Sequence, residues 1–336
     1  MQMEKQQASI TIPDKQEMQD IHFWGKMINW GLDYSMYVVF FILIVLSSIL
    51  SPYFLSWANF TNILRQVSFN GIISIGMCMV ILMRGIDLSV GSIFGLANVL
   101  VAGFASWGFW GVLGVALVVG LACGAFNGIL VTKVKIEPFV VTLGTLIIAR
   151  GLAFIYTEGV LIPNITQFRF IGAGYLVGIP VPAIIMIVLF ALAYFIQTST
   201  VFGRRCYAVG GNPEAAKMAG ISVDYYLFLS YVVAGVLAAF SGLIMVARMT
   251  TGEPTAGNMF ELDAIAAVVM GGTTFHGGRG GIIGTIFGVL ILGIISNILN
   301  LMNVSSYTQL VVKGFFLIFA VVLSEIRKNV ATLNFK

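Results

Sequence analysis

Residues 281–302 read GIIGTIFGVLILGIISNILNLM, a run that contains no charged side chain. A helix needs about 20 predominantly apolar residues to cross the roughly 30 Å hydrocarbon core of a bilayer. This run is long enough, and its glycines allow neighbouring helices to approach closely. It therefore predicts a membrane-spanning helix.

The rest of the chain repeats this pattern. Of its 336 residues, 59% are hydrophobic, only 10% are charged and 38 are glycine, a balance that a water-soluble domain of this size does not need. We expect an all-α, polytopic transmembrane helix bundle of about ten segments. They lie at roughly 36–55, 67–83, 88–106, 108–131, 138–156, 180–197, 225–247, 260–272, 281–302 and 308–325.

The positions of lysine and arginine test this count, because these residues collect in cytoplasmic loops. If the N-terminus is inside, thirteen basic residues fall in cytoplasmic stretches and only Arg65, Arg169 and Arg248 fall outside. Removing one segment inverts every later loop and destroys the bias. Ten segments with both termini cytoplasmic are therefore expected, and a version with eight, lacking two adjacent segments, remains open.

The predicted organisation has three parts, which are an interfacial or cytoplasmic tail at 1–35, a transmembrane domain at 36–326 and a cytoplasmic tail at 327–336. The first part lacks the pattern of a cleaved signal peptide. The net charge of +4 is spread over short loops and gives no reason to expect nucleic acid. The three cysteines lie far apart, so neither a disulfide framework nor a metal site is predicted.

The longest cytoplasmic connection, at about 198–224, contains a short helix with its own start and stop signals. Asn212 suits the N-cap, Pro213 the first turn and Glu214 the positive end of the helix dipole, while Gly220 ends the helix. A rigid helix with an alanine surface can be pushed by a partner. A plain connection between two spans fits the same pattern.

Four stretches carry a family resemblance. They are GIDLSVGS at 85–92, the loop at 210–221, ELDAIAAV at 261–268 followed by Gly271-Gly272-Thr273, and Ser305-Ser306-Tyr307 with Gln309 and Lys313. In these the chain resembles the ribose-type permeases of ATP-binding-cassette importers for monosaccharides. It departs from the family at two places, where Met83-Arg84 introduces a charge and Phe275-His276 is bulkier than usual.

The resemblance implies several partners in a bacterial cytoplasmic (inner) membrane. They are a second permease subunit, identical or merely similar, a cytoplasmic ATP-binding subunit and an extracytoplasmic sugar-binding protein. ATP and Mg²⁺ would bind to the ATP-binding subunit, and no cofactor is expected in this chain, which has no phosphate-binding Gly-x-x-x-x-Gly-Lys motif. The residues implied to dock into the ATPase are Gly211, Asn212, Pro213, Glu214, Ala215, Ala216 and Gly220.

Four charged residues near membrane depth are candidates for gating or for structure. Arg84 and Asp87 are three residues apart, a spacing at which they can pair on a helical turn, and a helix-terminus contact or substrate contact is the alternative for Asp87. Glu261 and Asp263 start a short segment, where we expect them to cap the helix and gate the entrance.

The external arginines suggest a docking surface. Opposite charges across a transient interface speed and orient docking, so Arg65 and Arg248 are expected to receive acidic residues of the sugar-binding protein. Ordinary solvation of loops is the other interpretation.

Intramembrane asparagines are the candidates for the sugar pathway, because a sugar needs hydrogen-bonding groups beside flat apolar faces. Asparagine also joins helices through hydrogen bonds, so each has a structural alternative. The candidates are Asn70, Asn98, Asn127, Asn297 and Asn300.

Taken together, the sequence predicts a permease subunit of an ATP-driven, binding-protein-dependent monosaccharide importer, for ribose or a related pentose, that works by alternating access and is not itself an enzyme. An ion-coupled secondary sugar transporter or channel is the alternative, and it would require a chain of intramembrane acids or histidines. The sequence shows no such relay.

Overall fold

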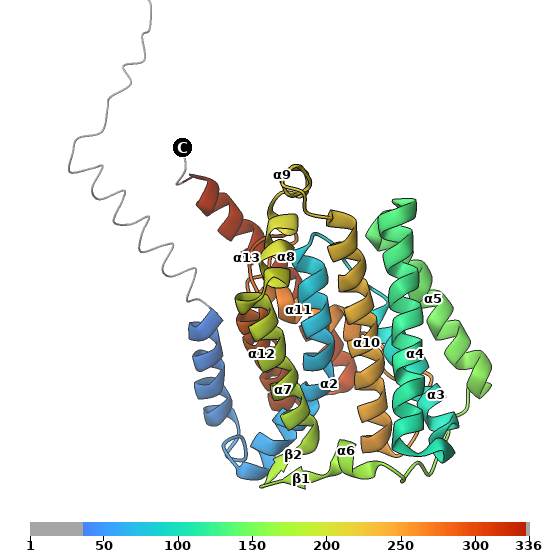
Figure 1. The fold of residues 1–336 in the computed structure, drawn as a ribbon. Coiled ribbons are helices and arrows are strands. Elements are labelled where there is room, and N and C mark those ends of the chain that lie inside the picture. The colour runs from blue at the N-terminus through green and yellow to red at the C-terminus, as the bar shows by residue number, and fades with distance from the viewer. Residues whose placement is uncertain (1–35, 334–336) are drawn as a thin grey trace, which may run out of the picture.

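A computed structural model describes residues 36–333 of the chain. The predicted tail at 1–35 and residues 334–336 of the predicted C-terminal tail lie outside the described residues. The described chain is a bundle of helices, most of them running between two opposite ends of the molecule (Figure 1). Beside the helices there is a two-stranded antiparallel hairpin, β1 (Tyr175–Leu176) and β2 (Ile179–Pro180), in which Tyr175 lies opposite Pro180.

The helices follow one another with short connections. In chain order they are Met36–Leu50, α2 (Trp57–Leu82), α3 (Val90–Gly103), α4 (Gly108–Ile129), α5 (Pro138–Thr157), α6 (Arg169–Ala173), α7 (Val181–Ser199), α8 (Val201–Gly211), α9 (Pro213–Met218), α10 (Val223–Met249), α11 (Phe260–Met270), α12 (Ile282–Leu301) and α13 (Ser306–Leu333). A 3₁₀ turn precedes α4 and a π-helical turn follows it.

The structure confirms an all-α, polytopic membrane fold. Among the described residues, six helical stretches are long and apolar enough to cross a membrane, and Met36–Leu50 and α3 are shorter apolar helices. The six are α2, the stretch Ala105–Val134 that contains α4, α5, α7, α10 and α12. The expected total of about ten crossings stays a prediction.

Helix α2 begins at Trp57, well before its predicted start at 67. Ser56 caps it by accepting a hydrogen bond from the Asn59 backbone N–H at 3.2 Å. The polar first turns masked the helix in the sequence, because Asn59 is buried and exchanges hydrogen bonds with Asn297 of α12 at 2.7 and 3.0 Å. A polar residue that faces another helix looks like loop sequence when its partner is unknown.

Helices α2 and α10 form the centre of the bundle. Helix α2 packs against α7, α10, α11 and α12, and α10 packs against α2, α3 and α4. Glycine permits this proximity, since a Cβ atom at Gly76 would lie 2.6 Å from the Ala234 Cα and one at Gly124 would lie 2.6 Å from the Tyr231 carbonyl oxygen. These two seams are closed by backbone contact.

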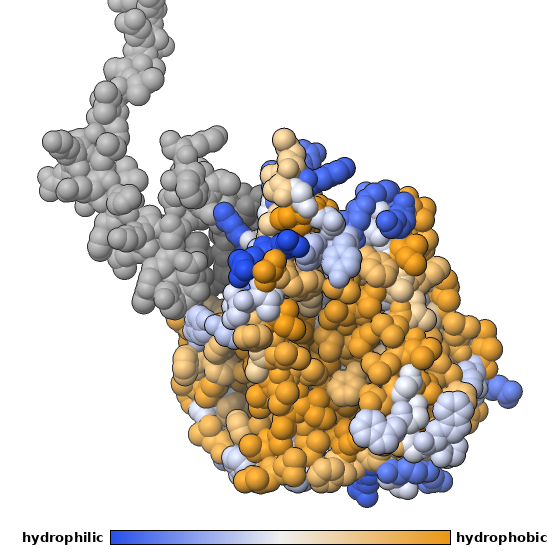
Figure 2. Space-filling model, viewed as in Figure 1, coloured by the Kyte–Doolittle hydropathy of each residue, from blue (hydrophilic) through white to orange (hydrophobic). Residues whose placement is uncertain are grey.

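The outer surface matches a bilayer. Hydrophobic side chains cover the middle of the face shown in Figure 2, and hydrophilic side chains gather at its two ends. Large apolar residues of the outer helices are exposed, among them Val118 of α4, Ile155 of α5 and Phe195 of α7. A soluble monomer does not expose such a continuous apolar band.

The loops that were predicted to share a side of the membrane meet in space. At one end the Gly278 backbone N–H donates to the Leu82 carbonyl at 2.9 Å, and Lys135 forms an ion pair with Asp224 at 2.6 Å. At the other end the Ile162 and Gly252 backbones bridge. Helix α11 ends at Met270, and the glycine-rich stretch at 271–281 turns the chain back into α12.

Candidate functional site

The connection predicted at about 198–224, which we call the coupling loop, forms two short helices, α8 and α9, at one end of the bundle (Figure 1). Asn212 caps α9 as expected, because its Oδ1 accepts hydrogen bonds from the backbone N–H groups of Glu214 and Ala215, both at 3.1 Å. Gly220 ends the turn with a φ of +78°, a conformation that favours glycine. Helix α9 covers only Pro213–Met218, and Gly211 is the last residue of α8.

One face of α9 is anchored and the other is free. Ala216 is buried in a small cluster with Leu82 and Val209, whereas the Met218 side chain is 90% exposed. The arrangement holds the helix rigidly while presenting a surface that another protein can contact.

Arg84 fastens the coupling loop to the core. Its Nε donates to the Gly210 carbonyl at 2.7 Å and its Nη2 donates to the Gly211 carbonyl at 2.5 Å. These are carbonyls at the C-terminal end of α8, where a cation is favourable. The predicted ion pair between Arg84 and Asp87 is therefore wrong, because a left-handed turn at Arg84 (φ +67°) ends α2 and its side chain binds α8.

A second connection joins α8 to the glycine-rich stretch at 271–281. The Tyr207 hydroxyl donates to the Gly280 carbonyl at 2.7 Å. Burial raises the pKa of the Tyr207 phenol and of the neighbouring Cys206 thiol, each to about 12. Both groups stay protonated at neutral pH, so Tyr207 keeps the hydrogen with which it donates.

Asp87 belongs to a buried polar network. Its Oδ1 accepts hydrogen bonds from the Ser89 backbone N–H at 2.9 Å and from the Ser89 hydroxyl at 2.5 Å. Asn127 of α4 donates to the same hydroxyl at 2.8 Å, and Thr145 of α5 donates to Asn127 Oδ1 at 2.6 Å. The network joins the start of α3 to α4 and α5, while Asp87 Oδ2 is buried and finds no hydrogen-bond donor in the described part of the chain.

Ser89 and Thr145 were not singled out from the sequence. Ser89 stands in the same GIDLSVGS stretch as Asp87, and its place just before a span is the signal that could have identified it. Nothing in the sequence brings Thr145 to Asn127, since they lie on different helices.

The acidic residues Glu261 and Asp263 lie in the first turn of α11 and do not occupy its N-cap position. Met259 is the N-cap residue, and its side chain makes no capping hydrogen bond among the described residues. Asp263 forms an ion pair with Lys313 of α13 at 2.7 Å, a neighbour that sequence spacing could not supply. The Oε2 atom of Glu261 is buried without a partner and lies so close to α3 that a Cβ atom at Gly91 would be 2.0 Å away.

Arg150 of α5 is a further charged group near the start of α11, and no function was predicted for it from the sequence. Its Nη1 donates to the carbonyls of Pro254 at 2.7 Å and Ala256 at 2.9 Å, which fixes the connection between α10 and α11 to α5. A lone arginine inside an apolar span was the available signal.

Four of the five candidate asparagines form hydrogen bonds within the bundle. Asn98 donates to the Gly242 carbonyl at 3.3 Å and accepts from the Glu253 backbone N–H at 2.8 Å, and Asn300 accepts from Gln309 at 2.9 Å. Asn127 and Asn297 have the partners described above. Asn70 differs, because its Oδ1 is buried and no described residue donates a hydrogen bond to it.

Arg65 and Arg248 lie at the end of the bundle opposite α9 and are held against aromatic rings. Arg65 donates to the Tyr175 hydroxyl, with its guanidinium carbon 4.8 Å from that ring centroid. The Arg248 guanidinium carbon lies 5.3 Å from the Phe69 ring centroid. Stacking of this kind fixes the positions of both charges.

The described side chains contain no cluster that could hold a metal ion.

Comparison with known proteins places these features in context. Residues 59–321 match a family described as "Branched-chain amino acid transport system / permease component". The chain is 47% identical to a ribose import permease protein of Bacillus subtilis over 92% of this chain and 96% of that protein. It is 40% identical to the ribose import permease protein of Escherichia coli K12 over 88% of this chain and 94% of that protein.

Permeases for other sugars are similar as well. The D-allose transport system permease protein of Escherichia coli K12 is 38% identical over 90% of this chain and 95% of that protein. A fructose import permease protein of Rhizobium meliloti is 37% identical over 86% of this chain and 84% of that protein. No solved structure matches the chain.

Proposed function

The chain belongs to the family of branched-chain amino acid transport system permease components, within it to the ribose-type permeases of ATP-binding-cassette importers, and we therefore propose that it carries ribose across the bacterial cytoplasmic membrane. The observation that supports ribose best is the 47% identity to a ribose import permease over nearly the whole of both chains. D-allose and fructose are the next candidates, because permeases for these sugars are also similar.

The proposed mechanism is alternating access driven from outside the chain. ATP and Mg²⁺ bind to a cytoplasmic ATP-binding subunit, and this chain contributes no nucleotide site or cofactor. The exposed residues between Gly211 and Gly220 contact that subunit through α9, while the buried Ala216 anchors the helix. Support comes from the free face of α9 and from Arg84, which connects α8 directly to the end of the central helix α2.

We retain the topology of about ten crossings with both termini cytoplasmic, and the transmembrane domain at 36–326. Each predicted segment overlaps a described helix, and loops assigned to one side meet at one end of the bundle. This topology puts α9 in the cytoplasm and the hairpin β1–β2 outside.

The remaining roles follow from this orientation. A second permease subunit completes the path, and an external sugar-binding protein delivers ribose near Arg65 and Arg248. Asn70 is the preferred pathway residue, since its amide oxygen is free to accept a hydrogen bond. Asp87 and Glu261, each with one unpaired carboxylate oxygen, are the preferred gating residues.

The test is uptake of labelled ribose into vesicles that contain the chain with its ATP-binding subunit and its sugar-binding protein. Uptake should require ATP and should be lost in Glu214→Arg, which reverses a charge on α9. Glu137→Arg is the matched control, because Glu137 is exposed just before α5, away from α9. Labelled D-allose and fructose serve as competing substrates.

Two results would overturn the proposal. Uptake by the chain alone down an ion gradient would favour a secondary transporter. ATP-dependent uptake of fructose or D-allose with no uptake of ribose would leave the importer standing but change its substrate.

A further inference from the structure

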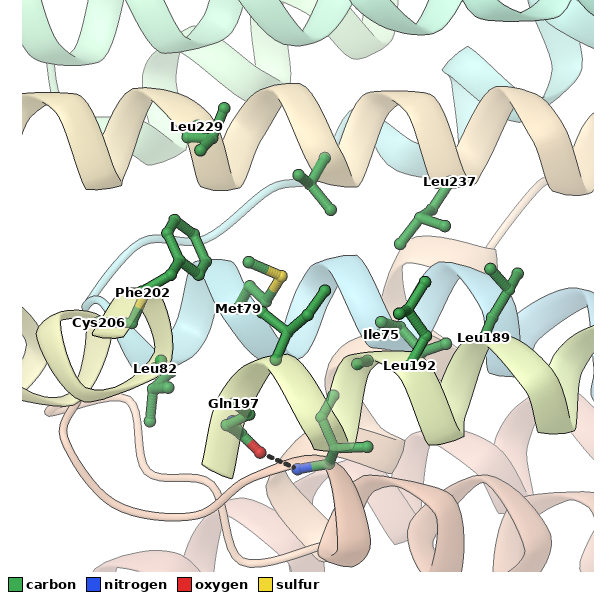
Figure 3. A pocket seen from close by; sticks show the side chains of 15 residues that line it. Ile75, Met79, Leu82, Leu189, Leu192, Gln197, Phe202, Cys206, Leu229 and Leu237 are labelled. Atoms are coloured by element: carbon green, nitrogen blue, oxygen red, sulfur yellow. Dashed lines mark hydrogen bonds between the residues drawn. The ribbon is translucent and has the colours of Figure 1, made fainter. Parts of the chain in front are cut away.

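One side of α10 is left partly uncovered by the other described helices. Between α7 and α10 lies a groove of about 340 Å³ with α2 as its floor, shown in Figure 3. Its walls are built from Leu189, Leu192 and Ile196 of α7 and from Leu229, Val233 and Leu237 of α10. This volume is within the range of small-ligand pockets.

The groove is suited to an aliphatic group. Gln197 is the one amide among its lining residues, and its Oε1 already accepts a hydrogen bond from the Ile282 backbone N–H at 2.9 Å (Figure 3). A polar ligand would lose its hydrogen bonds to water here without replacing them. A hydrocarbon chain loses nothing.

Cationic side chains stand at one end of this groove. Phe202 of α8 lines the groove and contacts the Tyr226 ring, with centroids 5.4 Å apart. Tyr226 lies one helical turn before Leu229 on α10, and its hydroxyl accepts a hydrogen bond from Arg205 Nη1 at 2.8 Å. Arg204, the preceding residue of α8, is also exposed. Among the described side chains no carboxylate pairs with either arginine.

We propose that the groove binds an anionic phospholipid of the cytoplasmic leaflet, with one acyl chain between α7 and α10 and the phosphate at Arg205 and Arg204. The remaining guanidinium N–H groups of Arg205 can donate to phosphate oxygens. Basic residues beside a cleft between transmembrane helices attract anionic headgroups on this side of a membrane.

A second copy of the chain fits the groove less well. The cytoplasmic end of each copy is basic, so a neighbour seated here would bring further positive charge towards Arg204 and Arg205. A phospholipid instead supplies both the apolar tail and the missing negative charge.

Native mass spectrometry of the intact transporter complex in detergent tests the site, with phosphatidylglycerol and phosphatidylethanolamine of identical acyl chains as probes. We expect phosphatidylglycerol to bind preferentially. Arg205→Gln should weaken its binding about fivefold, since a basic residue at the membrane surface contributes about 1 kcal/mol. Ala193→Phe, which fills the groove from α7, should weaken both lipids.

Lys133→Gln is the matched control, because Lys133 is an exposed basic residue at the same end of the molecule beyond α4. The proposal requires this variant to bind phosphatidylglycerol like the unchanged chain. It is overturned if Lys133→Gln weakens binding as much as Arg205→Gln, if both lipids bind equally, or if Ala193→Phe has no effect. Cross-linking of Val233→Cys to a second copy would also overturn it.

Discussion

Helix α10 has two unlike sides. Towards α2 and α4 it is closed by glycine, which brings backbones into contact at Gly76 and Gly124. Towards α7 it presents Leu229, Val233 and Leu237, and a groove remains. Small residues therefore let the helices of a membrane bundle pack in direct contact. Large aliphatic residues leave a gap between helices, which the bilayer tolerates because lipid can fill it as well as leucine can.

The largest effect should come from disturbing the closed side at Gly76. Gly76→Val places a side chain where Cβ would be 2.6 Å from the Ala234 Cα, so α2 and α10 must separate. Overpacking of this kind costs about 1–3 kcal/mol or more. We expect little folded protein by size-exclusion chromatography. Gly114→Val on α4 is the control, because its Cβ would meet nothing within 4 Å, and equal yields of the two variants would contradict the closed seam.

A matched pair of leucines on α10 compares its two sides directly. Leu243 is fully buried, so Leu243→Ala should lower the free energy of unfolding by about 2–5 kcal/mol. Leu237 lines the groove, so Leu237→Ala should lower it by less than about 1 kcal/mol, since lipid replaces the lost contacts. Thermal unfolding in one detergent measures both. Equal decreases in the free energy of unfolding for the two variants would mean that the groove is closed.

Arg84 connects α2 to α8, the helix that closes the inner end of the open side. Arg84→Gln should lower the ribose transported per ATP hydrolysed by about tenfold, since hydrogen bonds from a charged group contribute about 1.5–3 kcal/mol. Arg84→Lys, which keeps the charge but not the forked geometry, should be intermediate. If both variants transport as much ribose per ATP hydrolysed as the unchanged chain, the hydrogen bonds from Arg84 to α8 are not needed for coupling.

A small effect on stability is expected within the polar network that contains Ser89, Asn127 and Thr145. Asn127→Ala removes two hydrogen bonds between helices, and at about 0.6 kcal/mol each the loss is about 1 kcal/mol.

Asn70→Ala should not lower stability, because its amide oxygen is unpaired, but it should slow ribose uptake. If Asn70→Ala lowers the thermal stability and leaves ribose uptake into vesicles unchanged, Asn70 is not a pathway residue.

The sequence was informative where a property is local. Apolar length located the helices, and the cap at Asn212 was identified because the N-cap oxygen binds N–H groups two and three residues further on. The meeting of distant loops at one end of the bundle followed instead from charge counting, which is not local, because it sums over the chain and tolerates errors in any one boundary.

Interactions between helices were not predictable in this way. The early start of α2 was missed because Asn59 has its partner on α12, and Asp263 was expected to cap α11 although Lys313 of α13 binds it. Arg84 and Asp87 have the spacing of a helical pair, yet the chain turns between them and their side chains diverge. Spacing predicts a pair only when the chain remains helical throughout.

The brevity of α9 has a consequence for inhibitor design. A helix of six residues is far below the roughly 12–15 at which an isolated peptide becomes marginally helical in water, so α9 depends on the burial of Ala216 and on its attachment to α8. A linear peptide copied from residues 210–221 would lose that shape. A competitor for the surface proposed to receive α9 would need a covalent cross-link to hold its helical shape in place of the contacts with the rest of the protein.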